Sequence, residues 1–209
     1  LSYSDDRGAS VGGVKLSVEF ASCPWDEDLA LMGVLLQNDS DRVVASEADV
    51  ILTMDPDFVK SYRLIGYAGR EDPEVPANRA PSTGGLVSGR SNYVLYQIRL
   101  QKKEWRDSRK IMARVSLRAG IAAEELVVPV TRVPKEWVLA SNNLKTAVAL
   151  SSWGMVLRQS PFGGPLTHFD VGRMAREALQ SVDATELKRR EALQLILDSL
   201  PLFEVDAGS

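Results

Sequence analysis

The clearest indication of the fold is the run Asp57-Phe58-Val59-Lys60-Ser61-Tyr62-Arg63-Leu64-Ile65-Gly66-Tyr67-Ala68-Gly69-Arg70. Its centre, residues 62–67, is aromatic and aliphatic with one arginine, and Gly66, Gly69 and the proline-rich segment beyond them interrupt the apolar run. Glycine and proline commonly bound short core strands in this way. The run therefore predicts a strand that leads into a turn, and not a catalytic loop.

Similar short runs occur on both sides of this strand. Residues 14–20 alternate apolar and polar side chains, which predicts a half-buried strand, and residues 29–36 are almost continuously apolar, which predicts a strand in the middle of a sheet. Residues 70–91 hold several prolines and glycines and predict a long irregular loop. The remaining predicted strands span residues 48–54, 92–100, 111–117 and 126–133. About seven short strands without helical patterns between them indicate an antiparallel sandwich or partial barrel.

The apolar pattern changes its period after Pro134. Residues 144–157 are apolar on nearly every face, which predicts a helix enclosed by other elements, with Ser141 or Asn142 as its N-cap. Two further helices are predicted from apparent capping boxes, one formed by Thr167 with Asp170 and one formed by Asp183 with Glu186. The last of these helices is expected to end at Pro201.

These patterns predict an α+β protein, in which an antiparallel β-sandwich is followed by a C-terminal three-helix segment packed against it. The predicted division is a β-sandwich framework at residues 1–135 and a helical segment at residues 136–209. A chain of 209 residues with 44% hydrophobic content can bury a substantial core, as one large domain or two small ones.

Composition limits the chemistry that the chain can support. The net charge of -3 argues against electrostatic attraction of the whole chain to nucleic acid. A single cysteine, Cys23, and a single histidine, His168, exclude an intrachain disulfide and the usual zinc sites. The sequence has no run of 18 apolar residues, so no membrane-spanning segment is predicted.

A basic segment between Arg99 and Arg118 is the one candidate binding site. It contains eight basic and two acidic residues, a local charge of +6, and we expect a tryptophan at the tip of a hairpin. Such a segment can hold an anionic partner, such as phosphate, lipid headgroups or nucleic acid. The simpler interpretation, which we favour, is a solvated hairpin whose charges prevent pairing of a sheet edge. The candidate anion-binding or partner-binding residues are Lys102, Lys103, Trp105, Arg106, Arg109 and Lys110.

Other chemically notable residues have structural interpretations. His168, at the start of a predicted helix, is expected to be a surface or capping residue because general-base work needs a positioned partner. Cys23 is a candidate reactive thiol, but a small buried residue at a strand end is favoured. Trp25 and Trp153 are expected to pack in the core or between domains and not to line a ligand pocket. The three acidic residues 26–28 lack the spacing of a calcium loop.

Three separated motifs resemble one family. Residues 20–26 are similar to the Cys-Pro-Trp segment of bacterial YfbK-like proteins, which carry a von Willebrand factor type A domain. Residues 61–70 resemble the Tyr-Arg-Leu-Ile-Gly-Tyr segment of that family, and residues 152–162 resemble its Gly-Met-Leu-Leu-Arg-x-Ser-Pro-Tyr segment. In the family, the A domain lies between the first two motifs, where this chain has only residues 37–47. The resemblance therefore implies that the A domain is absent and that the strands flanking this insertion point fold as one sandwich.

The metal site of the A domain is not expected here. That site needs an Asp-x-Ser-x-Ser run, and the nearest sequence, Asp39-Ser40-Asp41, has the wrong spacing. Metal-dependent adhesion is therefore not carried over from the family. We found no other motif that predicts a catalytic site or a cofactor.

The sequence thus predicts a non-catalytic protein-interaction or scaffold module that binds another protein and needs no cofactor. The resemblance implies a periplasmic or cell-envelope location. Two alternatives remain. One is a hydrolase or transferase whose site is assembled from distant loops, with His168 in hydrogen-bond reach of a serine or carboxylate. The other is an anion-binding accessory domain that uses residues 99–118.

Overall fold

The computed structural model describes residues 9–11, 14–38, 49–65, 75–76, 91–101, 113–119, 124–130 and 134–205. The strands are β1 (Ala9–Val11), β2 (Val14–Ser22), β3 (Leu29–Asn38), β4 (Asp49–Met54), β5 (Val59–Ile65), β6 (Val75–Pro76), β7 (Ser91–Leu100), β8 (Ala113–Ala119) and β9 (Glu124–Val130). The helices are the short 3-10 helix η1 (Trp137–Leu139), α1 (Asn142–Leu157), α2 (His168–Ser181), α3 (Leu187–Ser199) and α4 (Pro201–Val205).

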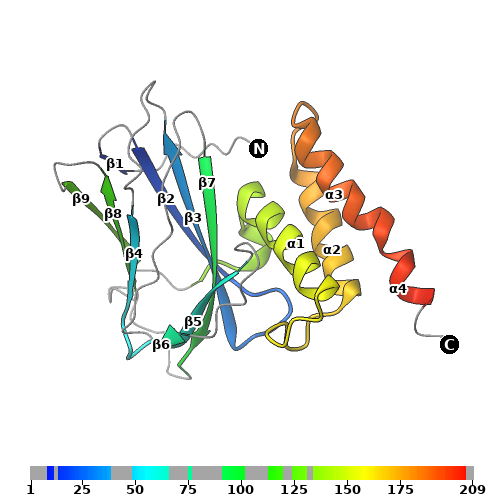
Figure 1. Cartoon of the computed structure of the whole chain (residues 1–209), viewed down its shortest axis with the longest axis horizontal. Coiled ribbons are helices and arrows are strands. Elements are labelled where there is room, and N and C mark those ends of the chain that lie inside the picture. Colours follow the sequence, from blue (N-terminus) through cyan, green and yellow to red (C-terminus); the bar gives the residue numbers. More distant parts are fainter. Residues whose placement is uncertain are drawn as a thin grey trace.

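The strands form two antiparallel sheets, and the helices form a third layer. One sheet has six strands in the order β1-β2-β3-β7-β5-β6, and the other has three in the order β4-β8-β9. Figure 1 shows the larger sheet in the middle, with the smaller sheet on one side and α1, α2 and α3 on the other. The predicted fold class, an antiparallel sandwich followed by three packed helices, is confirmed.

The larger sheet is buried on both faces, which explains the continuous apolar run in β3. Met32 and Val34 of this strand contribute to the core between the two sheets. Leu29 and Leu31 contribute to the core between the larger sheet and the helices. Successive side chains of a strand point to opposite faces, so only a strand covered on both sides needs apolar residues at consecutive positions.

β5, the strand indicated most clearly by the sequence, connects the two cores. Tyr62 and Leu64 contribute to the core between the sheets, whereas Ile65 contributes to the core under the helices. Arg63, which lies between Tyr62 and Leu64 in the sequence, is also buried, and its Nε donates to Gln97 Oε1 at 2.5 Å.

The same arginine reaches the connection between α1 and α2. Its Nη2 lies 3.4 Å from the carbonyl oxygen of Phe162, and its guanidinium carbon lies 4.7 Å from the centre of the Phe162 ring. Nη2 also lies 3.0 Å from Met155 Sδ, so one buried cation joins the sheet to the helical layer. A cation over an aromatic ring is attracted by the ring quadrupole, and the contact is stronger in a desolvated site.

The insertion point predicted near residues 37–47 begins at the last two residues of β3 and continues into the connection to β4. These two strands belong to different sheets, but Leu36 of β3 and Leu52 and Met54 of β4 lie in the same core. The segments on both sides of this connection therefore form one sandwich, as expected. Residues 39–48, which connect them, lie outside the described ranges.

The predicted hairpin between residues 99 and 118 was wrong. β7 lies between β3 and β5 in the larger sheet, whereas β8 lies between β4 and β9 in the smaller one. Both edges of β7 are already paired, so β8 cannot add to it. The basic segment therefore connects the two sheets.

The helix starts follow the capping signals with one exception. Ser141 is the N-cap of α1, where its side chain accepts from Leu144 N, and Thr167 with Asp170 forms the predicted capping box of α2. The box predicted from Asp183 and Glu186 was wrong, because α3 begins one residue after Glu186 without a side-chain cap. Asp183 Oδ1 instead accepts from the backbone N and Oγ1 of Thr185, so it forms a turn before the helix.

Pro201 has two roles at the C-terminal end of the helical layer. It stops α3, which ends at Ser199, and it is also the first residue of α4. Proline is favoured at the first helical position because its fixed φ suits the helix and its missing N–H would have no partner there. No helix in the described part of the chain is long and apolar enough to cross a membrane.

Candidate functional site

The basic site predicted from the sequence lies outside the described residues. All six of its candidate residues are in the connection from β7 to β8, which is described only to Gln101 and again from Ala113. They are Lys102, Lys103, Trp105, Arg106, Arg109 and Lys110. Anion binding by this segment therefore remains a prediction.

Cys23 is a buried thiol under the helical layer. It lies just after β2 and contributes to the core between the larger sheet and the helices. Burial raises the pKa of the Cys23 thiol from 9.0 to about 12. Because the thiolate is the nucleophilic form, this thiol is unreactive at neutral pH, as the structural interpretation predicted.

The two candidate tryptophans pack on the same core. Trp25 and Trp153 are partly buried against the cluster under the helices. The indole Nε1 of Trp153 donates to Ser199 Oγ at 3.0 Å, which joins α1 to the end of α3. Their structural interpretation is confirmed.

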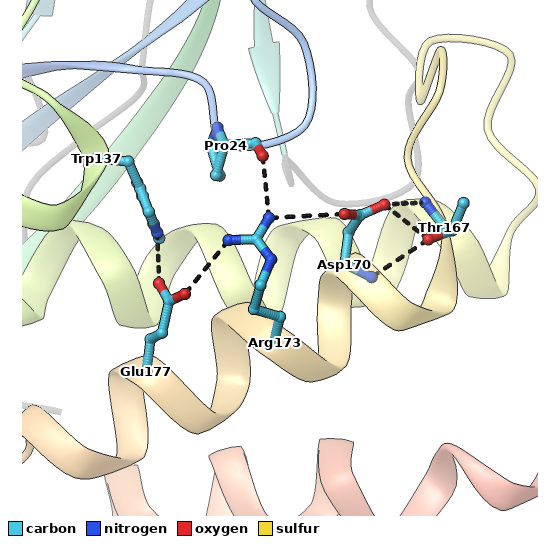
Figure 2. Close-up of polar contacts among 6 residues, drawn as sticks. All are labelled: Pro24, Trp137, Thr167, Asp170, Arg173 and Glu177. Atoms are coloured by element: carbon cyan, nitrogen blue, oxygen red, sulfur yellow. Dashed lines mark hydrogen bonds and ion pairs between the residues drawn. The ribbon is translucent and has the colours of Figure 1, made fainter.

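Arg173 is the centre of a polar ladder along α2 (Figure 2). Its Nη2 donates to the carbonyl oxygen of Pro24 at 3.0 Å and lies 3.6 Å from Asp170 Oδ1. Its Nη1 lies 3.3 Å from Glu177 Oε1, and Glu177 Oε2 accepts from Trp137 Nε1 at 2.6 Å. The ladder therefore joins α2 to η1 and to the connection after β2.

This arrangement gives a testable prediction about stability. Arg173→Gln is expected to lower the free energy of unfolding by about 1 kcal/mol, because it removes the contacts of the guanidinium to the Pro24 carbonyl and to the Asp170 and Glu177 carboxylates. Arg176→Gln, on the exposed side of the same helix, is the matched control and is expected to change it by less than about 0.5 kcal/mol. Urea unfolding followed by circular dichroism measures both. Equal effects of the two substitutions would show that the ladder does not hold α2 to the sandwich.

Glu19 provides a second polar connection between layers. Its Oε1 accepts from the backbone N of Ser141 at 2.8 Å, and its Oε2 accepts from the Ser141 hydroxyl. Lys135 Nζ lies 3.6 Å from the same carboxylate. The carboxylates of Glu19, Asp170 and Glu177 thus serve to position the helices.

The helical layer contains a pocket of about 210 Å³. It lies between the first turns of α2, the last turn of α3 and the start of α4. Its lining residues are His168, Phe169, Gly172, Arg176, Leu197, Leu200 and Pro201.

Gly172 allows this pocket to form where α2 meets the end of α3. A β-carbon at Gly172 would lie 2.7 Å from Leu200 Cδ1 and 3.5 Å from Arg176 Nη1. Leu200 therefore packs directly on the backbone of α2, and the Arg176 guanidinium lies beside it. The close approach brings a cation next to apolar side chains.

His168 is part of the wall of the pocket and also contacts α4. Its ring stacks on Phe203 with the ring centres 5.8 Å apart, and it lies 4.0 Å from the ring of Phe169. Nε2 of His168 is buried and has no hydrogen-bond partner among the residues described. The histidine is the first residue of α2, but the expectation of a surface or capping residue was wrong, because Thr167 is the N-cap and His168 is half-buried against Phe169 and Phe203.

Two large apolar side chains beside the pocket are exposed to solvent. Phe169 lines the pocket with 68% of its surface exposed, and Leu202, which follows the pocket residue Pro201, is 69% exposed. Exposed apolar side chains that surround a concave site are typical of protein interaction sites. We call the pocket, together with Phe169 and Leu202, the α2–α4 face.

The sequence contained a partial signal for this face. The capping box of Thr167 and Asp170 fixes where α2 begins, and Val171, Met174 and Ala178 form its buried stripe. Phe169 is therefore off the buried stripe of an amphipathic helix. The pocket itself could not be predicted, because it depends on how Leu200 packs on Gly172.

The alternative enzyme hypothesis needs His168 near a serine or a carboxylate. The described residues that line the pocket include neither. In the part of the chain that the structure describes, no group of three His, Cys, Asp or Glu side chains is placed to hold a metal ion. The face is suited to binding through apolar contact and positive charge.

Comparison with known proteins gives no family for this chain. No family model matches the sequence, and no curated protein matches it.

Proposed function

We propose that the protein is a non-catalytic protein-interaction or scaffold module, and that it binds another protein on the α2–α4 face. The observation that carries this proposal is the pocket of about 210 Å³ beside two solvent-exposed apolar side chains, Phe169 and Leu202. Large exposed apolar side chains in the lining of a concave site or next to it in the chain favour an interaction site over a solvated surface.

The remainder of the described structure supports the role of a framework. The larger sheet is covered on both faces, and the polar side chains of Arg173, Glu177 and Glu19 hold the helical layer on it. A rigid support of this kind presents a binding surface at low entropic cost, because the surface does not need to be ordered on binding. The three motifs that resemble YfbK-like proteins favour a location at the bacterial cell envelope for this module.

A comparison of two double variants tests the proposal. Phe169→Ser with Leu202→Ser is expected to reduce the recovery of a specific partner from the host lysate by about tenfold or more, because truncation of apolar anchors removes most of the binding energy. Leu187→Ser with Leu195→Ser is the matched control, since these leucines are also exposed, but neither lines the pocket nor, unlike Leu202, directly adjoins a lining residue in the chain. Quantitative mass spectrometry of the bound fraction measures the loss.

Thermal unfolding of each variant provides the folding control. Both pairs replace exposed side chains, so both variants are expected to remain folded. Loss of the same partner in both variants would contradict binding at the α2–α4 face. Recovery of no partner, together with turnover of a substrate by the purified protein, would contradict the non-catalytic role.

A further inference from the structure

We propose that the pocket of the α2–α4 face binds a carboxylate that is attached to a bulky apolar group, as presented by an acidic-apolar segment of a partner protein. This inference rests on the proposed protein-binding function and specifies the chemistry of the partner. It follows from the size of the pocket, the charge of its wall and the state of its polar groups.

The size of the pocket selects a single side chain as its occupant. Pockets for drug-sized molecules and cofactors usually have volumes of about 300–1,000 Å³. The volume of this pocket, about 210 Å³, is below that range. It suits one apolar anchor of a partner, which is the way that interface hot spots are filled.

The charge of the wall selects an acidic neighbour for that anchor. Among the described residues that line the pocket, His168 and Arg176 are titratable and none is acidic. Arg176 has no ion-pair partner among the residues that the structure describes, in contrast to Arg173 one turn earlier, which contacts Asp170 and Glu177.

The guanidinium of Arg176 is available for a ligand. Arg176 is exposed and its guanidinium lies beside Gly172 at the pocket wall, whereas Nε2 of His168 is buried and has no partner within the described ranges. A guanidinium presents donors in a fixed fork that matches the two oxygens of a carboxylate. Leu197, Leu200 and Pro201 supply the apolar wall that an attached side chain would contact.

Two small probes that differ in one group test this inference. N-acetyl-L-phenylalanine carries an apolar ring and a carboxylate, and N-acetyl-L-phenylalaninamide is the neutral equivalent. Titration of each is followed by the NMR shifts of the backbone amides of Phe169, Gly172 and Arg176. The carboxylate probe is expected to bind about threefold to tenfold more tightly than the amide probe, the range expected for one charged contact at a partly exposed site.

Two variants then test whether the difference in affinity between the probes is due to Arg176. In Arg176→Gln, the two probes are expected to bind with equal affinity, whereas in Arg158→Gln the preference is expected to persist, because Arg158 is exposed and does not line the pocket. Equal affinities in the unmodified protein, no saturable shifts at these amides, or loss of the preference in Arg158→Gln would each overturn the inference. A different result is loss of the partner in the Phe169→Ser, Leu202→Ser variant while the two probes bind the unmodified protein with equal affinity. That combination would support the proposed function but reject a carboxylate as the group that the pocket binds.

Discussion

Leu144→Ala is expected to lower the free energy of unfolding by about 2–5 kcal/mol, the range observed when a large apolar side chain is removed from a close-packed core. Leu144 lies in α1 and is 0% exposed, in the cluster that also contains Leu31 of β3 and Met174 of α2. For a chain of this size, the loss corresponds to a fall of about 4–20 °C in melting temperature. Thermal and urea unfolding measure it.

The control for this prediction is Leu195→Ala. Leu195 is 57% exposed on α3, so its truncation is expected to change the stability by less than about 0.5 kcal/mol. We also expect one cooperative transition in both proteins, because sheet and helix residues share the cluster around Leu144. Two separate transitions would instead support independent units that divide near residue 135, and an effect of Leu144→Ala no larger than that of the control would contradict the packing of α1 on the sheet.

The sequence predicted most of the fold because the relevant signals are local. The alternation in residues 14–20 and the continuous apolar run in residues 29–36 follow from the number of faces that each strand buries, which is a property of the strand itself. The capping box of Thr167 and Asp170 is likewise complete within four residues. Such signals do not depend on which elements pack together.

Two of the wrong predictions, the β7–β8 hairpin and the capping box of α3, concern contacts for which another partner competes. β7 and β8 are consecutive strands, and sequential strands often pair. Here both edges of β7 are occupied, one by β3 and the other by β5. Asp183 has the spacing of a capping residue, yet Thr185 provides both an N–H and a hydroxyl at closer range. In each case, a competing partner that the pattern does not reveal determines the structure.

The candidate site was the least predictable part of the molecule. Its walls come from α2 and from the junction of α3 with α4, which are separated in sequence but meet at Gly172 and Leu200. Residues 102–110, which the sequence favoured as a binding candidate, carry a simple charge signal that can be recognised without tertiary structure. A pocket built from apolar side chains has no such signal, because the same residue types fill the core.

Stability is expected to fall as the pH rises above about 9, because the buried thiol of Cys23 is held in its neutral form. Burial raises the pKa of Cys23 from 9.0 to about 12, and burial raises the pKa of Tyr62 to about 12 in the core between the sheets. Between about pH 9 and about pH 12, the Cys23 thiol is ionised in the unfolded chain but remains protonated in the folded protein. The stabilising contribution is therefore complete below about pH 9 and is lost as the pH rises through the folded pKa.

Cys23→Ala isolates the contribution of the thiol. One such group lowers the free energy of unfolding by about 1.4 kcal/mol per pH unit between its unfolded and folded pKa values. The stability advantage of the unmodified protein over Cys23→Ala is thus expected to decrease by about 2 kcal/mol between about pH 9 and about pH 10.5, as measured by urea unfolding. Tyrosine and lysine ionisation affects both proteins equally and cancels in this comparison. A constant difference over the same range would mean that water reaches the thiol, and that the sheet and the helices are not closely packed at the end of β2.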